Sequence, residues 1–347
     1  MYYFPNPFIN NEAIDIRGIS LSYTVASGKQ ALSIALKSFD LPAGSAVAIP
    51  AFCCNEVVGA VSDAGHFPVF FDLKEQGSYW AEYKEERLRE EKIKVVIITH
   101  LYGYLHPDTQ RIADSCAAHG IKLIHDAAQS YGIDERLLMN APLVYSFGPG
   151  KSTTAARGGE LLNVNEDKLP VPAKANRWDD MEAKAFFTAR TFGAVGDRLM
   201  PYKMKIAQYF RGKQHVITGL SPFQKEKAIQ AKAIARNPDN DRKKRYNILS
   251  AAIESSAHIR KADAAERGLS FKIVIFVEKD TDKFTGYLKQ HAVPYCRLAD
   301  SMNMTQRDVS KTPIFNETFR KLIEISTERS IPMDEINRIA TLLSEYK

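Results

Sequence analysis

The sequence has few cysteines and contains no apolar run long enough to cross a membrane. A spanning helix needs about 20 consecutive apolar residues, so we expect no integral membrane protein. The four cysteines show no metal-ligand spacing, which predicts neither a metal site nor a disulfide framework. The first 18 residues lack the basic start and apolar middle of a secretory signal. These observations predict a cytoplasmic protein that does not contact membranes.

A strong charge of either sign is also lacking. The net charge is +6 over 347 residues, which suits an anionic small-molecule ligand but indicates no polyanion. The basic run 242–245 (RKKR) is interpreted as a solvated helix face, so no nucleic-acid partner is expected. With 45% hydrophobic residues, the chain is long enough to bury one large and one smaller core.

Helical segments alternate with short apolar, β-branched segments between about residues 20 and 165. This alternation predicts a mostly parallel sheet with helices on both faces. Ligands of such sheets bind beyond the carboxyl ends of the strands. Three polar stretches follow predicted strands there: THLYG (99–103), HDAAQSYG (125–132) and SFGPGKST (146–153). The sequence therefore places a candidate site at that edge of the sheet.

The last third of the chain predicts a second, smaller unit. A basic amphipathic helix begins near residue 241, the apolar strand FKIVIFVEK follows at 271–279, and a closing helix covers 333–346. Strands flanked by helices indicate a small α+β domain. We therefore predict a large domain over residues 1–240 and a small domain over residues 241–347.

The stretch GPGKST around Lys151 resembles part of a loop that binds nucleotide phosphates. That loop requires a glycine six residues before the lysine, where this chain has Tyr145, and a helix directly after it. The following STTAARGG is β-branched and then broken by two glycines, which disfavours a helix. An ATP-binding loop is thus disfavoured, although a surface lysine in a turn remains an alternative.

A covalent role for Lys151 requires other groups, and the sequence contains them. Pyridoxal phosphate chemistry uses a lysine, an acid beside the ring nitrogen, and a phosphate site at a helix N-terminus. Asp126 ends an apolar strand, Ser27 and Gly28 precede an amphipathic helix, and Ser146 lies five residues before Lys151. Taken singly, Asp126 and Ser27 are equally explained as helix caps.

Several segments, in this order, resemble the DegT/StrS-type (DegT/DnrJ/EryC/StrS) sugar aminotransferases. The resemblance is dense over residues 20–165 and then thins. The matching segments are SGKQAL, AVAIPAF, GHFPVFFDL, THLYG, HDAAQSYG and SFGPGKSTTAARGGEL, with SPFQKEKAIQAKA and IPMDEINRI further along. The resemblance implies an α/β fold of the type I pyridoxal-phosphate-dependent transferase class. In that fold a large three-layer αβα domain carries a small C-terminal α+β domain.

The resemblance also implies roles for individual residues. Lys151 becomes the residue that binds the cofactor covalently and carries protons, and Asp126 becomes the partner of the pyridine nitrogen. Further matching positions are Gln129 at the O3′ edge of the cofactor and Ser27, Gly28, Lys29 and Ser146 at its phosphate. His100 and Tyr102 lie at a strand end near the ring and are candidate substrate residues, and Arg157 is a candidate contact for a substrate anion.

Some positions depart from the family pattern. Lys29 replaces a threonine at the phosphate, and Cys54 stands where an aromatic residue usually stacks on the cofactor ring. Ile217 and Gly219 stand where many members carry an Asn-x-Arg segment that reaches the partner subunit. Together, these departures affect substrate recognition more than the binding of the cofactor.

The resemblance implies an aminotransferase that moves an amino group, by analogy from glutamate, to a keto group of a nucleotide-linked sugar. It also implies pyridoxal 5′-phosphate as the cofactor and a homodimer as the working unit. One alternative is a pyridoxal-phosphate-binding regulatory protein of the same fold without transaminase turnover. Another is sugar dehydration, but the related dehydratases carry a histidine in place of the lysine.

Overall fold

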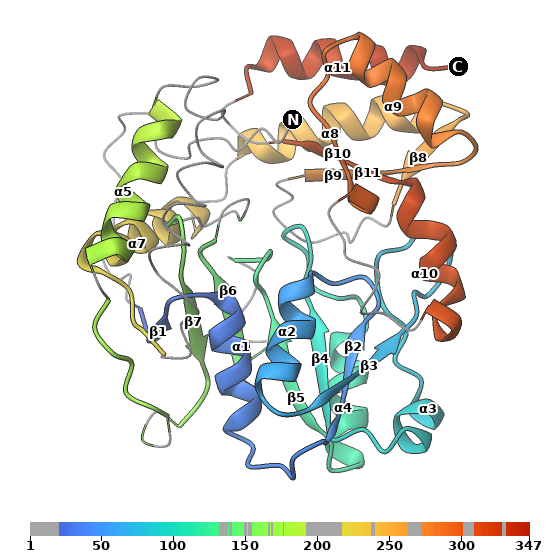
Figure 1. Cartoon of the computed structure of the whole chain (residues 1–347). Coiled ribbons are helices and arrows are strands. Elements are labelled where there is room, and N and C mark those ends of the chain that lie inside the picture. The colour runs from blue at the N-terminus through green and yellow to red at the C-terminus, as the bar shows by residue number, and fades with distance from the viewer. Residues whose placement is uncertain are drawn as a thin grey trace.

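The computed structural model describes residues 21–131, 138, 141–148, 151, 155–165, 167, 169–175, 177–191, 217–236, 240–262, 272–300, 309–327 and 331–347. The first 18 residues, used above to predict a cytoplasmic protein, lie outside these ranges. The described chain forms two β-sheets with helices packed on them (Figure 1). Within the described ranges, no helix has both the length and the apolar character needed to cross a membrane.

The larger sheet has seven strands in the order β1-β7-β6-β5-β4-β2-β3. The strands from β2 to β6 pair in parallel, whereas β7 runs antiparallel to both β6 and β1. The strands are β1 (Tyr23–Val25), β2 (Ala46–Pro50), β3 (Phe67–Phe71), β4 (Val95–Thr99), β5 (Lys122–Asp126), β6 (Leu143–Ser146) and β7 (Gly159–Leu162). The carboxyl ends of the parallel strands therefore meet at one edge, as the helix and strand alternation predicts.

Helices cover both faces of this sheet because its central strands are apolar on both sides. On β4, Val95 and Ile97 pack into the core beneath α1 and α2, whereas Val96 and Ile98 pack into the core beneath α3 and α4. Successive side chains of a strand point to opposite faces, so a fully apolar strand requires two cores. The helices are α1 (Gly28–Lys37), α2 (Asn55–Asp63), α3 (Glu85–Glu90) and α4 (Thr109–Ala118).

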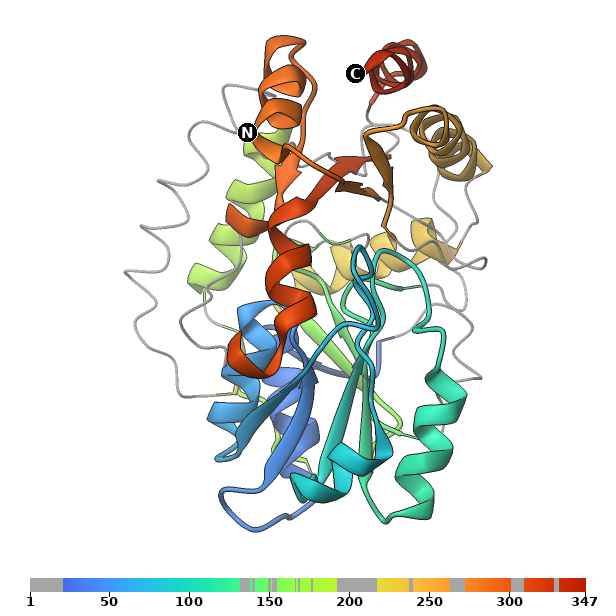
Figure 2. The same ribbon diagram turned by 90° about the vertical axis from the view of Figure 1, so that its right-hand side faces the viewer.

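The smaller sheet has four antiparallel strands in the order β10-β11-β9-β8. One face, which includes Ile273 and Ile275, packs against α8, α9 and α11 to form a separate core. The elements are α8 (Asn240–Glu254), β8 (Ile259–Lys261), β9 (Lys272–Val277), α9 (Thr281–Gln290), β10 (Cys296–Arg297), β11 (Leu322–Ser326) and α11 (Met333–Glu345). Figure 2 shows this sheet and its helices lying above the larger sheet.

The other face of the smaller sheet joins the main core. Val274 and Phe276 of β9 pack there with Phe315, which lies on α10 (Pro313–Thr318). Asp72, just after β3, accepts hydrogen bonds from the backbone N–H groups of Ile314 and Phe315 at 3.0 and 2.8 Å. The carboxylate of Asp72 therefore satisfies free N–H groups at the start of α10 and ties it to the larger sheet.

Two further helices, α5 (Arg177–Thr191) and α7 (Pro222–Arg236), lie beside β7 (Figure 1). A buried ion pair joins Lys232 of α7 to Glu160 of β7 at 2.9 Å, and the Ser22 N–H also donates to this carboxylate. Burial of both charges is tolerated only because they are paired and hydrogen-bonded. The pair therefore fixes α7 against the strand that borders the site described below.

The basic run 242–245 on α8 corrects one expectation. Lys243 and Lys244 are exposed, but Arg242 and Arg245 are only 6% and 4% exposed. Arg245 Nη1 donates to the backbone carbonyl of Ile331, so it anchors α8 to the segment that leads into α11. Consecutive helical residues point in different directions, and only part of a four-residue basic run can therefore face solvent.

Candidate active site

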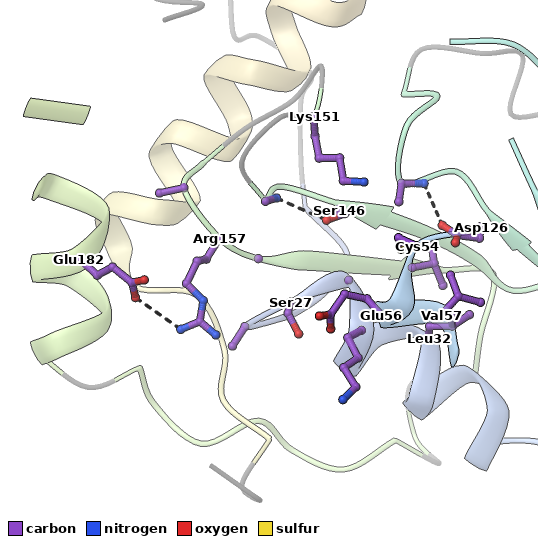
Figure 3. A pocket seen from close by; sticks show the side chains of 18 residues that line it. Ser27, Leu32, Cys54, Glu56, Val57, Asp126, Ser146, Lys151, Arg157 and Glu182 are labelled. Atoms are coloured by element: carbon purple, nitrogen blue, oxygen red, sulfur yellow. Dashed lines mark hydrogen bonds and ion pairs between the residues drawn. The ribbon is translucent and has the colours of Figure 1, made fainter. Parts of the chain in front are cut away.

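A cavity of about 370 Å³ opens where β5 and β6 end and α1 begins. Its lining includes Asp126 of β5, Ser146 of β6 and Lys151 from the chain that follows β6. Ser27 and Gly28 line it from the start of α1 (Figure 3). Three segments that are distant in the sequence therefore supply one site at the carboxyl edge of the parallel strands, where ligands of such sheets bind.

Asp126 is the last residue of β5 and is only 7% exposed. One carboxylate oxygen, Oδ1, accepts a hydrogen bond from the Ala128 N–H at 3.0 Å, which fixes the side chain at the strand end. Burial raises the pKa of Asp126 above its usual value, while that N–H and the charge of Lys151 act in the opposite direction. A cation bound beside this carboxylate would offset the cost of burying its charge.

The N-terminus of α1 forms a second wall. Ser27 caps the helix, and its hydroxyl accepts from the Gln30 N–H at 3.2 Å. Gly28 is required here because a Cβ on it would lie 2.9 Å from Cβ of Ser146. The absence of a side chain lets the first turn of α1 approach the end of β6. A helix N-terminus with a serine hydroxyl on each side is suited to bind an anion such as a phosphate.

Lys151 extends its side chain into the cavity near Ser146 (Figure 3). Burial raises the pKa values of both Asp126 and Cys54, and the charge of Lys151 acts in the opposite direction on each, which places the three groups in one electrostatic environment. In the described chain the next secondary-structure element after Lys151 is the strand β7. Residues 152–154 lie outside the described ranges. The next described residues, 155–158, are not helical, whereas a nucleotide-phosphate loop requires a helix directly after its lysine.

Cys54 and Lys29 also line the cavity. Cys54 is the N-cap residue of α2 and is reached by solvent through the cavity. The surrounding protein still raises the pKa of its thiol above the usual value, because it desolvates the charged form. The ammonium of Lys29 forms an ion pair with Asp63 at 2.9 Å and lies across Gly59 of α2. The positive charge of Lys29 is therefore already engaged by a carboxylate in this structure.

Arg157 lines the cavity from the segment just before β7. Its Nη1 atom lies 3.4 Å from Oδ1 of Asp179 and 3.6 Å from Oε2 of Glu182, two buried carboxylates on α5. Burial lowers the pKa of Arg157 below its usual value, and Asp179 opposes this. Asp179 and Glu182 are three residues apart, so they share one face of α5 and hold the guanidinium from the same side.

Three of the predicted site residues lie outside the cavity lining. His100 is 1% exposed, and its ring contacts His125 with 3.1 Å between Nε2 and Nδ1. The Tyr102 hydroxyl donates to Oε1 of Glu324 in β11 at 2.6 Å. The Tyr102 N–H donates to the side-chain carbonyl of Gln129 at 3.4 Å. Because the polar atoms of His100 and Tyr102 bond to the protein itself, we do not include these two residues in the site proposed below, and the role of Gln129 at the cofactor stays a prediction.

Sequence reasoning did not name several residues that line the cavity. The apolar ones lie at positions where the periodicity marks them only as core, and the acids lie on helices that carry no distinctive motif. These residues are Ala26, Leu32, Glu56, Val57, Ala128, Val144, Gly148, Ala156, Gly158 and Glu182. A usable signal for Glu182 is its i,i+3 spacing from Asp179 in DDMEA, which places two acids on one helical face.

Comparison with solved structures defines the class of fold. A DegT DnrJ EryC1 StrS aminotransferase from Brucella abortus superposes with a TM-score of 0.67 at 17% identity, covering 93% of this chain and 85% of that one. A GDP-4-keto-6-deoxy-D-mannose-3-dehydratase from E. coli, solved with bound hydrated PLP, gives a TM-score of 0.64 at 13% identity and covers 93% and 88%. The fold is that of the type I pyridoxal-phosphate-dependent transferases, as the sequence predicts.

Comparison of sequences defines the family. The model of the DegT/DnrJ/EryC1/StrS aminotransferase family matches residues 11–215, more than half of the chain. A GDP-perosamine synthase from Vibrio cholerae is 26% identical over 214 residues, which are 55% of this chain and 57% of the synthase. The chain spans about half the length of the curated relatives it matches. The protein belongs to the DegT/DnrJ/EryC1/StrS aminotransferase family, which confirms the resemblance seen in its sequence.

Proposed function

We propose that this protein is a pyridoxal-phosphate-dependent aminotransferase that transfers an amino group, from glutamate by analogy, to a keto group of a nucleotide-linked sugar. The observation that carries the proposal is the convergence of Lys151, Asp126, Ser146 and the start of α1 on one cavity. If Lys151 were only a surface lysine, or Asp126 only a helix cap, these groups would have no reason to face the same cavity. Membership in a family of aminotransferases supports the same reaction class.

The residues present fit pyridoxal phosphate. The buried carboxylate of Asp126 suits a protonated ring nitrogen, and the α1 N-terminus with Ser27 and Ser146 suits the phosphate. A cavity of about 370 Å³ is within the range of small-molecule sites. When bound, the cofactor supplies an aldehyde that reacts with amines and a protonated ring that withdraws electrons from the substrate.

The chain's own groups have separate tasks in this reaction. With the cofactor bound, the Lys151 amine would hold its aldehyde, and when free the same amine could take and return a proton at the substrate carbon. Asp126 would keep the ring nitrogen protonated by direct charge pairing. Leu32, Val57 and Val144 contribute apolar walls that exclude water from the region between these groups.

Borohydride reduction tests the covalent role of Lys151. Protein incubated with pyridoxal phosphate and reduced is expected to carry the cofactor mass on the peptide that contains Lys151. The Lys151→Ala variant is expected to lose both this modification and the visible absorption band of the bound cofactor. Lys243→Ala, at an exposed position of α8, serves as the control and should behave as wild type. A wild-type protein that acquires no modification at residue 151 would contradict the proposal.

Amino transfer is tested separately from cofactor binding. Wild-type protein loaded with cofactor is incubated with glutamate and a panel of keto-sugar nucleotides, and mass spectrometry detects the aminated product. We expect 2-oxoglutarate and an amino sugar in equal amounts. Cofactor binding without spectral conversion by glutamate would instead favour the regulatory, non-transaminase alternative.

The working unit and location are part of the same proposal. The family resemblance predicts a homodimer, and the mass of the active species in solution tests this. Turnover by a protein that remains monomeric at assay concentration would contradict the dimer. The proposed sugar-nucleotide acceptor agrees with the cytoplasmic location predicted from the sequence, and cell fractionation with an antibody to the chain tests that location.

A further inference from the structure

Arg157 lies directly beside the N-terminus of α1. The next residue, Gly158, forms a parallel β-bridge with Ser27, the N-cap of that helix. A Cβ on Gly159 would lie 2.5 Å from the carbonyl oxygen of Ser27, so only glycine permits this approach. The segment that carries Arg157 is therefore fixed at the anion-binding end of the cavity. Asp126 lies at a different part of the wall, with Ser27 and Ser146 between the two in Figure 3.

The guanidinium of Arg157 is held by one of its edges. Both of its ion pairs, to Asp179 and Glu182, use Nη1. Among the residues that the structure describes, no hydrogen-bond acceptor contacts Nε or Nη2 of Arg157. The side chain is 22% exposed and lines the cavity. An arginine with one edge braced by buried acids and the other open to a cavity is prepared to bind an anion in two-pronged geometry.

A second cation beside the start of α1, Lys29, is already engaged. Lys29 lines the cavity, but its ammonium pairs with Asp63 at 2.9 Å. The helix N-terminus and the two serine hydroxyls provide partial charges and neutral donors only. A phosphate carries close to two negative charges at neutral pH, and its transfer from water into a partly enclosed site requires a full positive charge nearby. Arg157 is the residue placed to supply that charge.

We propose that Arg157 binds the phosphate of the cofactor, with Ser27, Gly28 and Ser146, rather than an anionic group of the substrate. This inference rests on the proposed function, because it assumes that pyridoxal phosphate occupies the cavity. It changes the role predicted from the sequence, which assigned Arg157 to the substrate. Asp179 and Glu182 then act as positioning residues that orient the guanidinium.

The test compares pyridoxal 5′-phosphate with pyridoxal, which lacks the phosphate. Both are titrated into wild-type, Arg157→Gln and Arg157→Lys proteins that have been freed of cofactor, and absorbance reports binding. Arg157→Gln is expected to lose about ten- to hundred-fold in affinity for pyridoxal phosphate, the equivalent of one lost charge-assisted interaction. Its affinity for pyridoxal should remain within about twofold of wild type, by the same conversion. Arg157→Lys should be intermediate, since it keeps the charge but loses the planar fork.

A control and two outcomes separate this inference from the proposed function. Arg338→Gln, on the surface of α11, changes an arginine that pairs with Glu335 far from the cavity and should bind both compounds as wild type does. If wild-type protein binds neither compound, the proposed function itself fails. If Arg157→Gln loses both affinities equally, or loses neither, Arg157 is not a phosphate ligand although the proposed function can still stand. A raised KM for glutamate with unchanged cofactor affinity would return Arg157 to the substrate.

A second measurement uses only wild-type protein, in case Arg157→Gln does not fold with two buried acids left uncompensated. Phenylglyoxal modifies accessible arginines, and mass spectrometry quantifies its attachment to Arg157. Pyridoxal phosphate is expected to protect Arg157 by at least about tenfold in rate, in line with one strong ionic contact, whereas pyridoxal should protect it much less. Equal protection by the two compounds, or none by either, would overturn the proposal.

Discussion

Two groups of polar side chains lie at the carboxyl ends of β4 and β5, and the structure gives them opposite environments. Asp126 opens onto the cavity with Lys151, whereas the preceding residue, His125, is fully buried against His100. His100 accepts from the His106 N–H through Nδ1, so its proton lies on Nε2 and is directed to His125. The hydrogen bonds of the buried histidines are made within the protein, whereas Asp126 and Lys151 face a cavity that can receive a ligand.

The difference shows that polarity at a strand end does not by itself identify a site. His125 and Asp126 are adjacent in sequence, and successive residues of a strand face opposite sides of the sheet. Tyr102 adds a second reason, because Glu324 of the smaller sheet, 222 residues away, accepts its hydroxyl hydrogen. Substitutions in the two groups should therefore separate catalysis from stability.

The largest effect is expected for Asp126→Asn in the cavity. The amide can still accept from the Ala128 N–H, so the local turn is kept, but it cannot hold a proton on the ring nitrogen by charge pairing. Amino-transfer rate should fall about 10²- to 10³-fold, as for other losses of preorganised electrostatic stabilisation. Single-turnover kinetics with glutamate measure this rate, and thermal melts of the cofactor-free protein measure the effect on stability. Thermal stability should be equal to wild type or higher, because a buried carboxylate has been removed. An unchanged rate would mean that Asp126 does not act on the cofactor.

The buried histidines predict a loss of stability in acid. Burial lowers the pKa of His106 from 6.5 to about 4, and burial also lowers the pKa of His100. Between pH 6.5 and about 4, the unfolded chain binds more protons than the folded protein. The free energy of unfolding is therefore highest above pH 6.5 and falls as the pH drops toward 4. His106 alone should account for about 3 kcal/mol of unfolding free energy over this window.

Urea unfolding at a series of pH values measures this slope. His106→Gln is expected to flatten it, because the substituted side chain does not titrate, while His119→Gln at an exposed position should leave it unchanged. If the slope between pH 6.5 and 4 is the same in wild type and in His106→Gln, the buried ring is not its source.

The smallest of these effects is expected for Tyr102→Phe. The substitution removes the hydroxyl that donates to Oε1 of Glu324 and leaves a buried carboxylate with one fewer donor, although Lys272 still contacts its other oxygen. The cost in unfolding free energy should be about 2 kcal/mol. Tyr287→Phe, whose hydroxyl donates to a backbone carbonyl near the surface, is the matched control and should cost less.

Tyr102→Phe also tests whether the residue belongs to the active site. Because Tyr102 lies outside the cavity lining, the affinity for pyridoxal phosphate should not change. A variant that keeps full stability but loses substrate affinity would reverse the assignment and return Tyr102 to substrate binding, as the sequence first indicates.

Much of the fold could be predicted because local patterns determine it. The apolar segments at 95–98 and 123–124 and the amphipathic helices between them indicate a parallel sheet with two covered faces, and the structure has this arrangement. The grouping of Gly28, Asp126, Ser146 and Lys151 was also accessible, since each follows or precedes a recognisable element at one edge of the sheet. The basic run 242–245 was interpreted wrongly, because helix geometry buries two of its four side chains.

By itself, the sequence determined the alternation of helices and strands between about residues 20 and 165, the class of fold, the family and the groups available for pyridoxal-phosphate chemistry. The tertiary structure alone decided which of the polar residues at the strand ends face the cavity, and that Arg157 stands beside the first turn of α1 with two acids of α5 behind it. The physical reason is that side-chain direction follows strand register and close backbone contacts, here the approach of Gly159 to Ser27. Such contacts form between segments too distant along the chain for any local pattern to record them.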